Sequence, residues 1–397
     1  MSAPPLSAIG EHVDSVSSWT PERDDPDGAF EYVDLSAVDQ DAKVVSGARE
    51  LACSEAPSRA RQLIRAGDVL VSTVRPNLNG VALVPPELDG ATASTGFCVL
   101  RPRASQLDAR YLYQWVKSPR FVSDMVRKAT GASYPAVSDR IVCESKLPLP
   151  PLPEQRRIAA ILDKANALRT KRRAALAQLD TLTQSIFLDL FGDPATNPKG
   201  WPSRQLGQCA IKFSDGPFGS NLKSSHYTEA GVRVVRLQNI GVGEFLDADA
   251  AYISEHHFSK LKKHECLPGD VLVGTLGDPN LRACIQPRWL PVALNKADCV
   301  QIRPDSRTTT PEFLCALLNQ SATERMAQNR MYGQTRVRIS MGRLKGLSVP
   351  VPPIELQREF ARRVTAVEAL KTAQRASLAE QDALFASLQH RAFQGGL

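Results

Sequence analysis

Residues 148–155 read Pro-Leu-Pro-Pro-Leu-Pro-Glu-Gln, and residues 350–357 repeat the pattern as Pro-Val-Pro-Pro-Ile-Glu-Leu-Gln. The offset between them is 202 positions, from 148 to 350. The run Gly-Asp-Val-Leu-Val keeps the same offset, because it occupies 67–71 and again 269–273. Two single-residue matches share it: Gly131 with Gly333, and Ser138 with Ser340. Widely spaced landmarks in one register indicate an internal repeat, so the chain is predicted to be two copies of one unit.

Each copy ends in a predicted long helix. Apolar residues follow the proline-rich stretch at alternating steps of three and four, which is a heptad seam. The stripe is narrow, and the second one is interrupted by Gln374, Ser377 and Gln381. We predict that the two helices pair as an antiparallel coiled coil; the alternative is that each helix packs on its own globular half. The residues predicted to form the helix-pair and subunit interface are Ile158, Ile161, Ala165, Leu168, Leu179, Leu182, Ile186, Phe360, Val364, Val367, Leu370, Leu378, Leu384 and Leu388.

The globular halves are predicted to be mixed α/β (α+β). Short apolar runs such as 68–72 and 81–84 are bounded by glycine and proline, as strands are. Helical stretches follow at 108–128 and 311–329. The predicted organisation is a globular domain at 1–152, a long helix at 153–192, a linker at 193–200, a second globular domain at 201–352 and a second long helix at 353–397.

Charge and composition narrow the class of protein. The chain of 397 residues has a net charge of +7. Residues 193–352 carry 20 basic and 14 acidic side chains, whereas residues 1–152 carry 16 and 19. A basic segment of this kind fits contact with phosphates. No apolar run reaches the length of about 18 residues that a membrane span needs, and the N-terminus lacks the pattern of an export signal. We therefore expect a cytoplasmic protein with no membrane partner.

Motifs for catalysis and metal binding are missing. The stretch Gly216–Ser224 resembles a phosphate loop, but its spacing does not give G-x-x-x-x-G-K-S. No nucleophile elbow or H-E-x-x-H sequence occurs. The eight cysteines form no C-x-x-C pair, and His256, His257, His264 and Cys266 lack the paired spacing of a zinc site. We predict a non-catalytic chain without its own metal or cofactor.

Polar side chains instead cluster beside glycine-rich turns in both copies. Arginine can read guanine, and asparagine or glutamine can read adenine, through paired hydrogen bonds at base edges. Lysine and serine mostly hold phosphates. The set is persuasive because both copies place it at matching turns. The predicted DNA-binding residues are Arg75, Asn77, Lys128, Ser133, Tyr134, Ser220, Asn221, Lys223, Arg233, Arg236, Gln238, Asn239, Gln334, Thr335, Arg336 and Arg338.

Taken together, these motifs resemble the specificity subunit of type I restriction-modification systems. The resemblance also rests on three further stretches: Gly-Pro-Phe-Gly-Ser-Asn-Leu-Lys at 216–223, Val-Val-Arg-Leu-Gln-Asn-Ile at 234–240 and Arg-Ala-Phe-Gln-Gly-Gly-Leu at 391–397. The first copy has no clear counterpart of the 216–223 motif.

The resemblance implies two target recognition domains, at 1–152 and 201–352, which read a bipartite site on double-stranded DNA. It makes the two helices a spacer and a docking site for two modification subunits. It also implies that those partners carry S-adenosylmethionine and methylate adenine, and that separate restriction subunits carry the ATP- and Mg-dependent motor and nuclease.

Two other functions fit the same residues. The first is a stand-alone two-domain DNA-binding regulator, which would bind its site tightly without partners. The second is a coiled-coil scaffold with no DNA role, whose behaviour DNA would leave unchanged.

Overall fold

The computed structural model describes residues 4–277, 279–333 and 337–397. The chain forms two compact units, of which unit 1 comprises residues 1–172 and 377–397, and unit 2 comprises residues 173–376. Each unit therefore contains a globular part, one end of the first long helix and one end of the second. The expected mixed helix-and-sheet fold with two long helices is confirmed. The long helices are α5 (Leu152–Phe191) and α10 (Ile354–Ala392).

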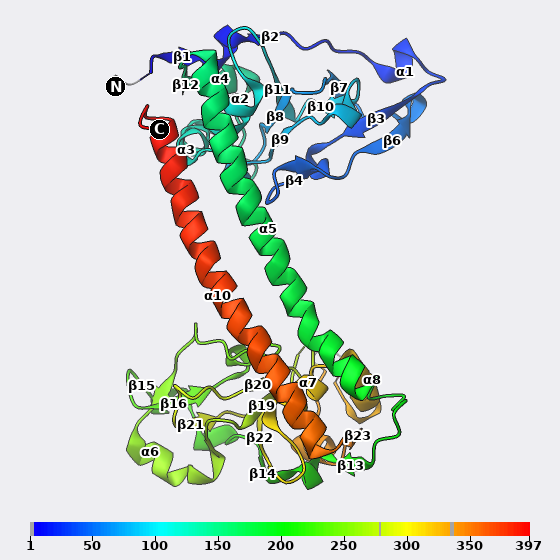
Figure 1. Ribbon diagram of the computed structural model, residues 1–397, viewed down its shortest axis with the longest axis vertical. Coiled ribbons are helices and arrows are strands. Elements are labelled where there is room, and N and C mark those ends of the chain that lie inside the picture. Colours follow the sequence, from blue (N-terminus) through cyan, green and yellow to red (C-terminus); the bar gives the residue numbers. More distant parts are fainter. Residues whose placement is uncertain (1–3, 278, 334–336) are drawn as a thin grey trace. The chain divides into compact units, whose positions relative to one another are not determined.

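Unit 1 contains two four-stranded sheets (Figure 1). In the first, β3 and β10 run parallel, and the other neighbours are antiparallel. The second sheet is antiparallel throughout. The strands of the first sheet are, in order, β6 (Arg49–Ala52), β3 (Ala29–Val33), β10 (Thr92–Ser94) and β7 (Ala60–Leu63). The strands of the second sheet are β2 (Val13–Asp14), β11 (Phe97–Pro102), β8 (Val69–Ser72) and β9 (Val81–Leu83). Two-stranded pairs are β1 (Leu6–Ala8) with β12 (Lys146–Pro148), and β4 (Val38–Asp39) with β5 (Val44–Val45).

Strand β8 lies between two apolar layers, which explains why it is apolar at successive positions. Val69 and Val71 pack in a core with Trp115 and the long helices. Leu70 lies in the second core, which lies between the two sheets. A strand buried on both faces is expected to read as a continuous apolar run. The short helices of unit 1 are α1 (Pro21–Asp24), α2 (Ala109–Val116), α3 (Pro119–Lys128) and α4 (Asp139–Glu144).

Unit 2 repeats this architecture, although its first sheet has five strands in place of four. Its first sheet has the order β15-β17-β16-β21-β18, in which β16 and β21 run parallel, and its second has the order β14-β22-β19-β20. The strands are β13 (Ser203–Gln205), β14 (Ala210–Ser214), β15 (Tyr227–Thr228), β16 (Val232–Val235), β17 (Tyr252–Ile253), β18 (Glu265–Cys266), β19 (Val271–Gly274), β20 (Ala283–Ile285), β21 (Ala293–Asn295), β22 (Cys299–Pro304) and β23 (Ser348–Pro350). The short helices are α6 (Glu255–Lys260), α7 (Pro311–Leu318), α8 (Ser321–Ala327) and α9 (Met341–Lys345).

The glutamine of the proline-rich motif fixes the start of each long helix. Gln155 is 1% exposed; its side-chain oxygen accepts from the Asp108 N–H, and its amide donates to the Gln106 and Pro150 carbonyls. Gln357, which lies 202 positions later, makes equivalent bonds: its side-chain oxygen accepts from the Thr310 N–H, and its amide donates to the Thr308 and Pro352 carbonyls. Buried polar side chains need such complete pairing, so the motif is a structural joint between helix and globular part.

The helices pair within each unit, but not through all the predicted residues. In unit 1 the Arg169 guanidinium bonds Asp382 and lies over the Phe385 ring, and in unit 2 the Lys371 ammonium contacts Asp180 at 2.9 Å. Of the predicted interface residues, Ile158, Phe360 and Val367 are buried. Those that are half-buried are Ile161, Ala165, Leu179, Ile186, Val364, Leu378 and Leu388.

Four predicted seam leucines are exposed, which corrects their assignment to the pairing. They are Leu168, Leu182, Leu370 and Leu384, with exposures of 50%, 38%, 53% and 57%. In the second helix the seam instead uses Lys371 and Phe385, each one residue further along. Since 3.5 and 3.6 residues per turn differ slightly, an apolar pattern read from sequence drifts to the flank of a long helix.

The alternative of each helix packing only on its own half is also incomplete. The C-terminal end of α10 enters the core of unit 1, where Phe393 lies 5.0 Å from Trp115, centroid to centroid. The C-terminal end of α5 enters the core of unit 2 through Phe187 and Phe191. Within the described ranges, no helix is both long enough and apolar enough to cross a membrane.

Candidate nucleic-acid interface

An exposed loop in unit 1 brings together three of the predicted DNA-binding residues. Reciprocal backbone hydrogen bonds between Thr130 and Ala136 close the loop. The Arg75 N–H donates to the Pro135 carbonyl at 2.7 Å. The Arg75 guanidinium lies 5.0 Å from the centroid of the Tyr134 ring, a cation–π arrangement, and Tyr134 is 69% exposed. Ser133 is exposed beside it, so the loop presents a cation, an aromatic ring and a hydroxyl to solvent.

The turn after β8 holds two residues in an unusual backbone conformation. Arg75 and Asn79 have φ values of +50° and +47°, in the left-handed region that non-glycine residues rarely adopt. The Lys43 ammonium stabilises the turn, because it donates to the Asn79 carbonyl at 2.6 Å. Burial lowers the pKa of Lys43. The predicted residue Asn77 is exposed between the two. Strained residues of this kind cluster at functional sites.

Lys128 ends α3, which packs against the same turn. Its ammonium lies 2.7 Å from an Asp124 carboxylate oxygen, and Arg127 contacts the other oxygen of that carboxylate. Lys128 is half-buried. Its charge is therefore partly balanced inside the unit, whereas Arg127, which the sequence analysis did not single out, has a side chain that is 78% exposed.

Unit 2 builds the equivalent loop with the same joints. Backbone bonds between Tyr332 and Arg338 close it, and Arg338 also bridges to Leu276, as Ala136 bridges to Val74 in unit 1. Gly333 has φ +103°, and its counterpart Gly131 has φ +101°. The predicted residues Gln334, Thr335 and Arg336 lie outside the described residues. Arg338, at the base of this loop, forms an ion pair with Asp298 and is half-buried.

An aromatic–cation pair in unit 2 was missed by the sequence analysis. The Arg343 guanidinium lies 5.0 Å from the centroid of the Tyr332 ring, and Tyr332 is 44% exposed. Arg343 belongs to α9, so the pair combines a loop residue with a helix residue. The spacing of the two residues in the sequence does not predict this contact. The usable signal was the position of Tyr332 immediately before the matched Gly333.

The loop after β14 carries three more predicted residues. A Cβ on Gly216 would lie 2.0 Å from the carbonyl carbon of Lys296, so only glycine fits this turn. Ser220, Asn221 and Lys223 that follow are exposed. The loop is tied to its neighbours: a His257 ring nitrogen bonds the Asn221 carbonyl at 2.9 Å. Its exposed hydroxyl, amide and ammonium suit contact with phosphates.

Two predicted contacts are corrected by burial. Arg233 is 5% exposed and lies 2.8 Å from the Asp247 carboxylate, and it also donates to the Asp249 carbonyl. Asn239 is fully buried; its amide donates to the Leu246 and Asp249 carbonyls. Both side chains are used within the unit to fix the segment that follows β16, so neither is available to DNA in this conformation.

The neighbours of these two residues are only partly engaged. Arg236 is half-buried and pairs with the Asp249 carboxylate. Gln238 is exposed and donates to the same carboxylate. Asp249 therefore orients both side chains, and of the two only Gln238 is open to solvent.

The histidines and the cysteine that were considered as zinc ligands do not form a common site. His257 bonds the Asn221 carbonyl and His264 the Asp215 carbonyl, while Cys266 is fully buried. In the part of the chain that the structure describes, no group of three or more histidine, cysteine, aspartate or glutamate side chains could hold a metal ion. All eight cysteines are free thiols, and only Cys143 among them is more than marginally accessible.

Comparisons with known proteins agree with this architecture. The family model of the type I restriction modification DNA specificity domain matches residues 63–178. The type I restriction enzyme MjaVIII specificity subunit of Methanocaldococcus jannaschii is 23% identical over 276 residues, or 66% of this chain and 64% of that protein. The chain thus matches slightly less than two thirds of that relative's length.

Solved structures match over nearly the whole chain. One, from a study of complex assembly and conformational transition of the type I R-M system, has a TM-score of 0.67 and 27% identity, covering 100% of this chain and 98% of the other. The type I restriction-modification S subunit of M. genitalium has a TM-score of 0.57 and 15% identity, and the match covers 98% of this chain and 96% of the other. At this identity the match supports the fold alone. With its internal repeat and paired long helices, the chain contains a type I restriction modification DNA specificity domain and is similar over most of its length to type I specificity subunits.

Proposed function

We propose that this chain is the DNA-recognition subunit of a type I restriction-modification complex and that it reads a bipartite site on double-stranded DNA. One observation carries the proposal. In both units, equivalent backbone bridges at the same end of the central strands β8 and β19 close a segment that contains a left-handed glycine, and an exposed tyrosine lies in each, Tyr134 and Tyr332. Two matched reading loops on one chain are what a two-part target requires.

Each loop supplies groups suited to nucleic acid. In unit 1, Arg75 and Asn77 can bond base edges, and the exposed Tyr134 ring can contact bases or sugars. In unit 2, Lys223 and Ser220 can hold phosphates. Arg336, outside the described residues, remains a proposed base contact. The chain itself performs no chemistry in this proposal: modification subunits supply S-adenosylmethionine and adenine methylation, and restriction subunits supply the ATP-driven motor and nuclease.

The long helices are proposed to set the separation of the two half-sites. Helix α5 is continuous over 40 residues, which is about 60 Å at 1.5 Å per residue. Successive major grooves on one face of DNA recur about every 34 Å. A helix of this length is sufficient to link recognition of two neighbouring grooves with an unread spacer between them.

Replacing Tyr134 with alanine is expected to relax only one half of the recognised sequence. Loss of an exposed aromatic contact should cost about 1–2 kcal/mol of DNA binding, or roughly 5- to 30-fold in affinity. The measurement is genome-wide mapping of N6-methyladenine in cells that carry the modification subunits with the parent or variant chain.

The repeat supplies the matched control. Tyr332→Ala should relax the other half of the motif and leave the first half intact. If either variant changed both halves, or if deleting the gene altered methylation at no bipartite motif, the recognition role would be wrong.

Partner docking is proposed for the exposed leucines of the long helices. Leu168 and Leu370 are equivalent through the repeat, and so are Leu182 and Leu384, since each pair differs by 202 positions. Of these four leucines, each unit has one on α5 and one on α10. Two equivalent apolar surfaces fit two copies of one modification subunit.

Leu168→Glu together with Leu370→Glu is expected to weaken capture of the modification subunit by roughly 30-fold, because each buried leucine contributes about 2 kcal/mol. Size-exclusion chromatography with light scattering would measure the loss of complex. Leu188→Glu is the control, because Leu188 is a similarly exposed leucine of α5, at 40%, and its repeat counterpart is His390. Equal assembly by both variants would contradict this docking surface.

A further inference from the structure

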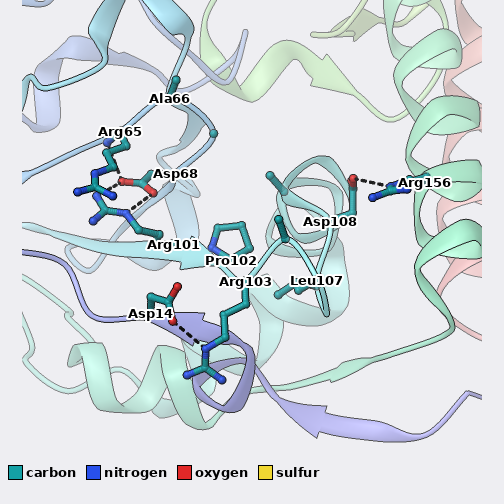
Figure 2. A pocket seen from close by; sticks show the side chains of 13 residues that line it. Asp14, Arg65, Ala66, Asp68, Arg101, Pro102, Arg103, Leu107, Asp108 and Arg156 are labelled. Atoms are coloured by element: carbon teal, nitrogen blue, oxygen red, sulfur yellow. Dashed lines mark hydrogen bonds and ion pairs between the residues drawn. The ribbon is translucent and has the colours of Figure 1, made fainter.

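A polar cavity of about 520 Å³ lies in unit 1, outside every residue discussed as DNA-binding (Figure 2). It is formed by the turn before β8, the end of β11, the start of α2 and one residue of α5. Its charged lining residues are Asp14, Arg65, Asp68, Arg101, Arg103, Asp108 and Arg156.

The cavity is at the opposite end of the sheet from the reading loop. Strand β8 begins next to Asp68 and ends at Ser72, before the turn that holds Arg75. Strand β11 runs antiparallel to it, with Phe97 opposite Ser72 and Leu100 opposite Val69. Arg101 and Arg103, which follow Leu100, therefore lie at the β8 start. A duplex bound at the reading loop would contact the other end of these strands.

Two of the arginines are committed to the fold. The Arg101 guanidinium bonds both carboxylate oxygens of Asp68, at 2.9 and 2.7 Å, and this pairing raises the pKa of Arg101. Arg103 bonds Asp14 at 2.7 Å and also the Glu11 and Val13 carbonyls. These pairs build a rigid wall and largely neutralise the aspartates Asp14 and Asp68.

The other two arginines of the lining, Arg65 and Arg156, are exposed to solvent. Arg65 is exposed; its backbone N–H donates to Asp68, and among the described residues its guanidinium has no carboxylate partner. The Arg156 side chain is 64% exposed and forms only a long ion pair with Asp108, at 3.9 Å, which is beyond hydrogen-bond distance (Figure 2). The Asp108 side chain instead caps α2 by accepting from the Tyr111 N–H.

The repeat does not preserve this arrangement. At the offset of 202, Leu267 stands for Arg65, Asp305 for Arg103 and Thr310 for Asp108, while Arg358 stands for Arg156. The Asp68–Arg101 pair is kept as Asp270–Arg303. The structural wall is thus common to both units, but the free arginine of the turn belongs to unit 1 alone.

We infer that this cavity binds a carboxylate-bearing segment of a partner protein, one copy per chain. The exposed guanidiniums of Arg65 and Arg156 can bond carboxylates, and Arg156 can exchange its long contact with Asp108 for a shorter one. Because the cavity is open and these two arginines are exposed, a bound segment must bring its own covering surface, as a protein does. The inference does not depend on which DNA sequence the loops read.

The probe is a fluorescein-labelled peptide of alternating glutamate and alanine, titrated with the full chain at low salt and followed by fluorescence anisotropy. The double variant Arg65→Glu with Arg156→Glu is expected to bind it at least tenfold more weakly than the parent. Arg358→Glu, at the matched position of unit 2, should bind the peptide like the parent. The double variant with glutamine in place of glutamate should also weaken binding, and serves if charge reversal impairs folding.

Two results would overturn the inference. One is an equal loss of peptide binding in Arg358→Glu, which would make the attraction a property of the whole basic surface. The other is displacement of the peptide by inorganic phosphate beyond the effect of sodium chloride at equal ionic strength, which would make the cavity a phosphate site. Methylation mapping of the same variants separates this from the recognition role, because the target motif should stay unchanged.

Discussion

Replacing Phe187 with alanine is expected to lower the free energy of unfolding of unit 2 by about 4 kcal/mol. The ring is 1% exposed and lies within a cluster of four phenylalanines from α5, α7 and α10. Its centroid is 5.0 Å from that of Phe191, 5.9 Å from Phe313 and 5.8 Å from Phe360. Truncation removes buried apolar surface and leaves a cavity that three rigid rings cannot close.

Urea denaturation followed by tryptophan fluorescence would measure this effect. Trp201 is a suitable reporter, because its indole N–H donates to the Phe191 carbonyl at 3.0 Å. Leu188→Ala is the control, since Leu188 is 40% exposed and should cost less than about 1 kcal/mol. Equal losses in the two variants would mean that the cluster does not hold α5 to unit 2.

The repeat makes the cluster a specific feature of unit 2. The positions matched to Phe187, Phe313 and Phe360 in unit 1 hold Gln389, Tyr111 and Ile158. Gln389 is buried, and its amide lies 3.5 Å from the Gln114 carbonyl, at the limit of a hydrogen bond. The aromatic packing of unit 1 is smaller: Phe393, which matches Phe191, lies 5.6 Å from Tyr111 and 5.0 Å from Trp115, centroid to centroid.

Asp270→Ala is expected to cost about 3 kcal/mol of stability, because it removes a buried carboxylate and leaves the half-buried Arg303 guanidinium and two further donors without their partner. The carboxylate accepts from Arg303 at 2.8 and 2.9 Å, from the Gln301 amide at 2.8 Å and from the Leu267 N–H at 2.7 Å. The Asp270 side chain is 2% exposed. Each donor left without a partner adds its own desolvation cost.

Thermal and urea unfolding of Asp270→Ala should be compared with Glu355→Ala. Glu355 forms an exposed pair with Arg358 one turn along α10 and is 76% exposed, so its loss should cost less than about 1 kcal/mol. Asp68→Ala should behave like Asp270→Ala, since Asp68 accepts equivalent bonds from Arg101. A loss for Asp270→Ala no larger than that for Glu355→Ala would contradict the assigned role of this pair.

Much of the fold could be predicted because the sequence repeats it. The Gly-Asp-Val-Leu-Val runs contain a left-handed glycine, with φ of +86° at Gly67 and +87° at Gly269, followed by a buried aspartate and a core strand. Local chemistry of this type is visible in sequence. Which face of a long helix meets its partner depends on a small angular drift per turn, and this is why Leu168 and Leu384 were placed in the seam.

The candidate site was less predictable, because polar residues serve two purposes. Arg233 and Asn239 have the side chains of base readers, yet Asp247 and nearby backbone carbonyls use them to fix a loop. Arg338 has a carboxylate partner, Asp298, whose counterpart in unit 1 is Gly96. Such pairings join segments that are far apart in the sequence, so the spacing of residues does not predict them.

The composition of unit 1 has a consequence for synthesis on the ribosome. Its core needs Phe385, Ala392 and Phe393, which are translated after the whole of unit 2. The N-terminal half must therefore wait, with part of its apolar interior uncovered, until the whole of unit 2 has been made. A truncated product that ends before α10 would keep that surface exposed, which makes it a substrate for chaperones and proteases.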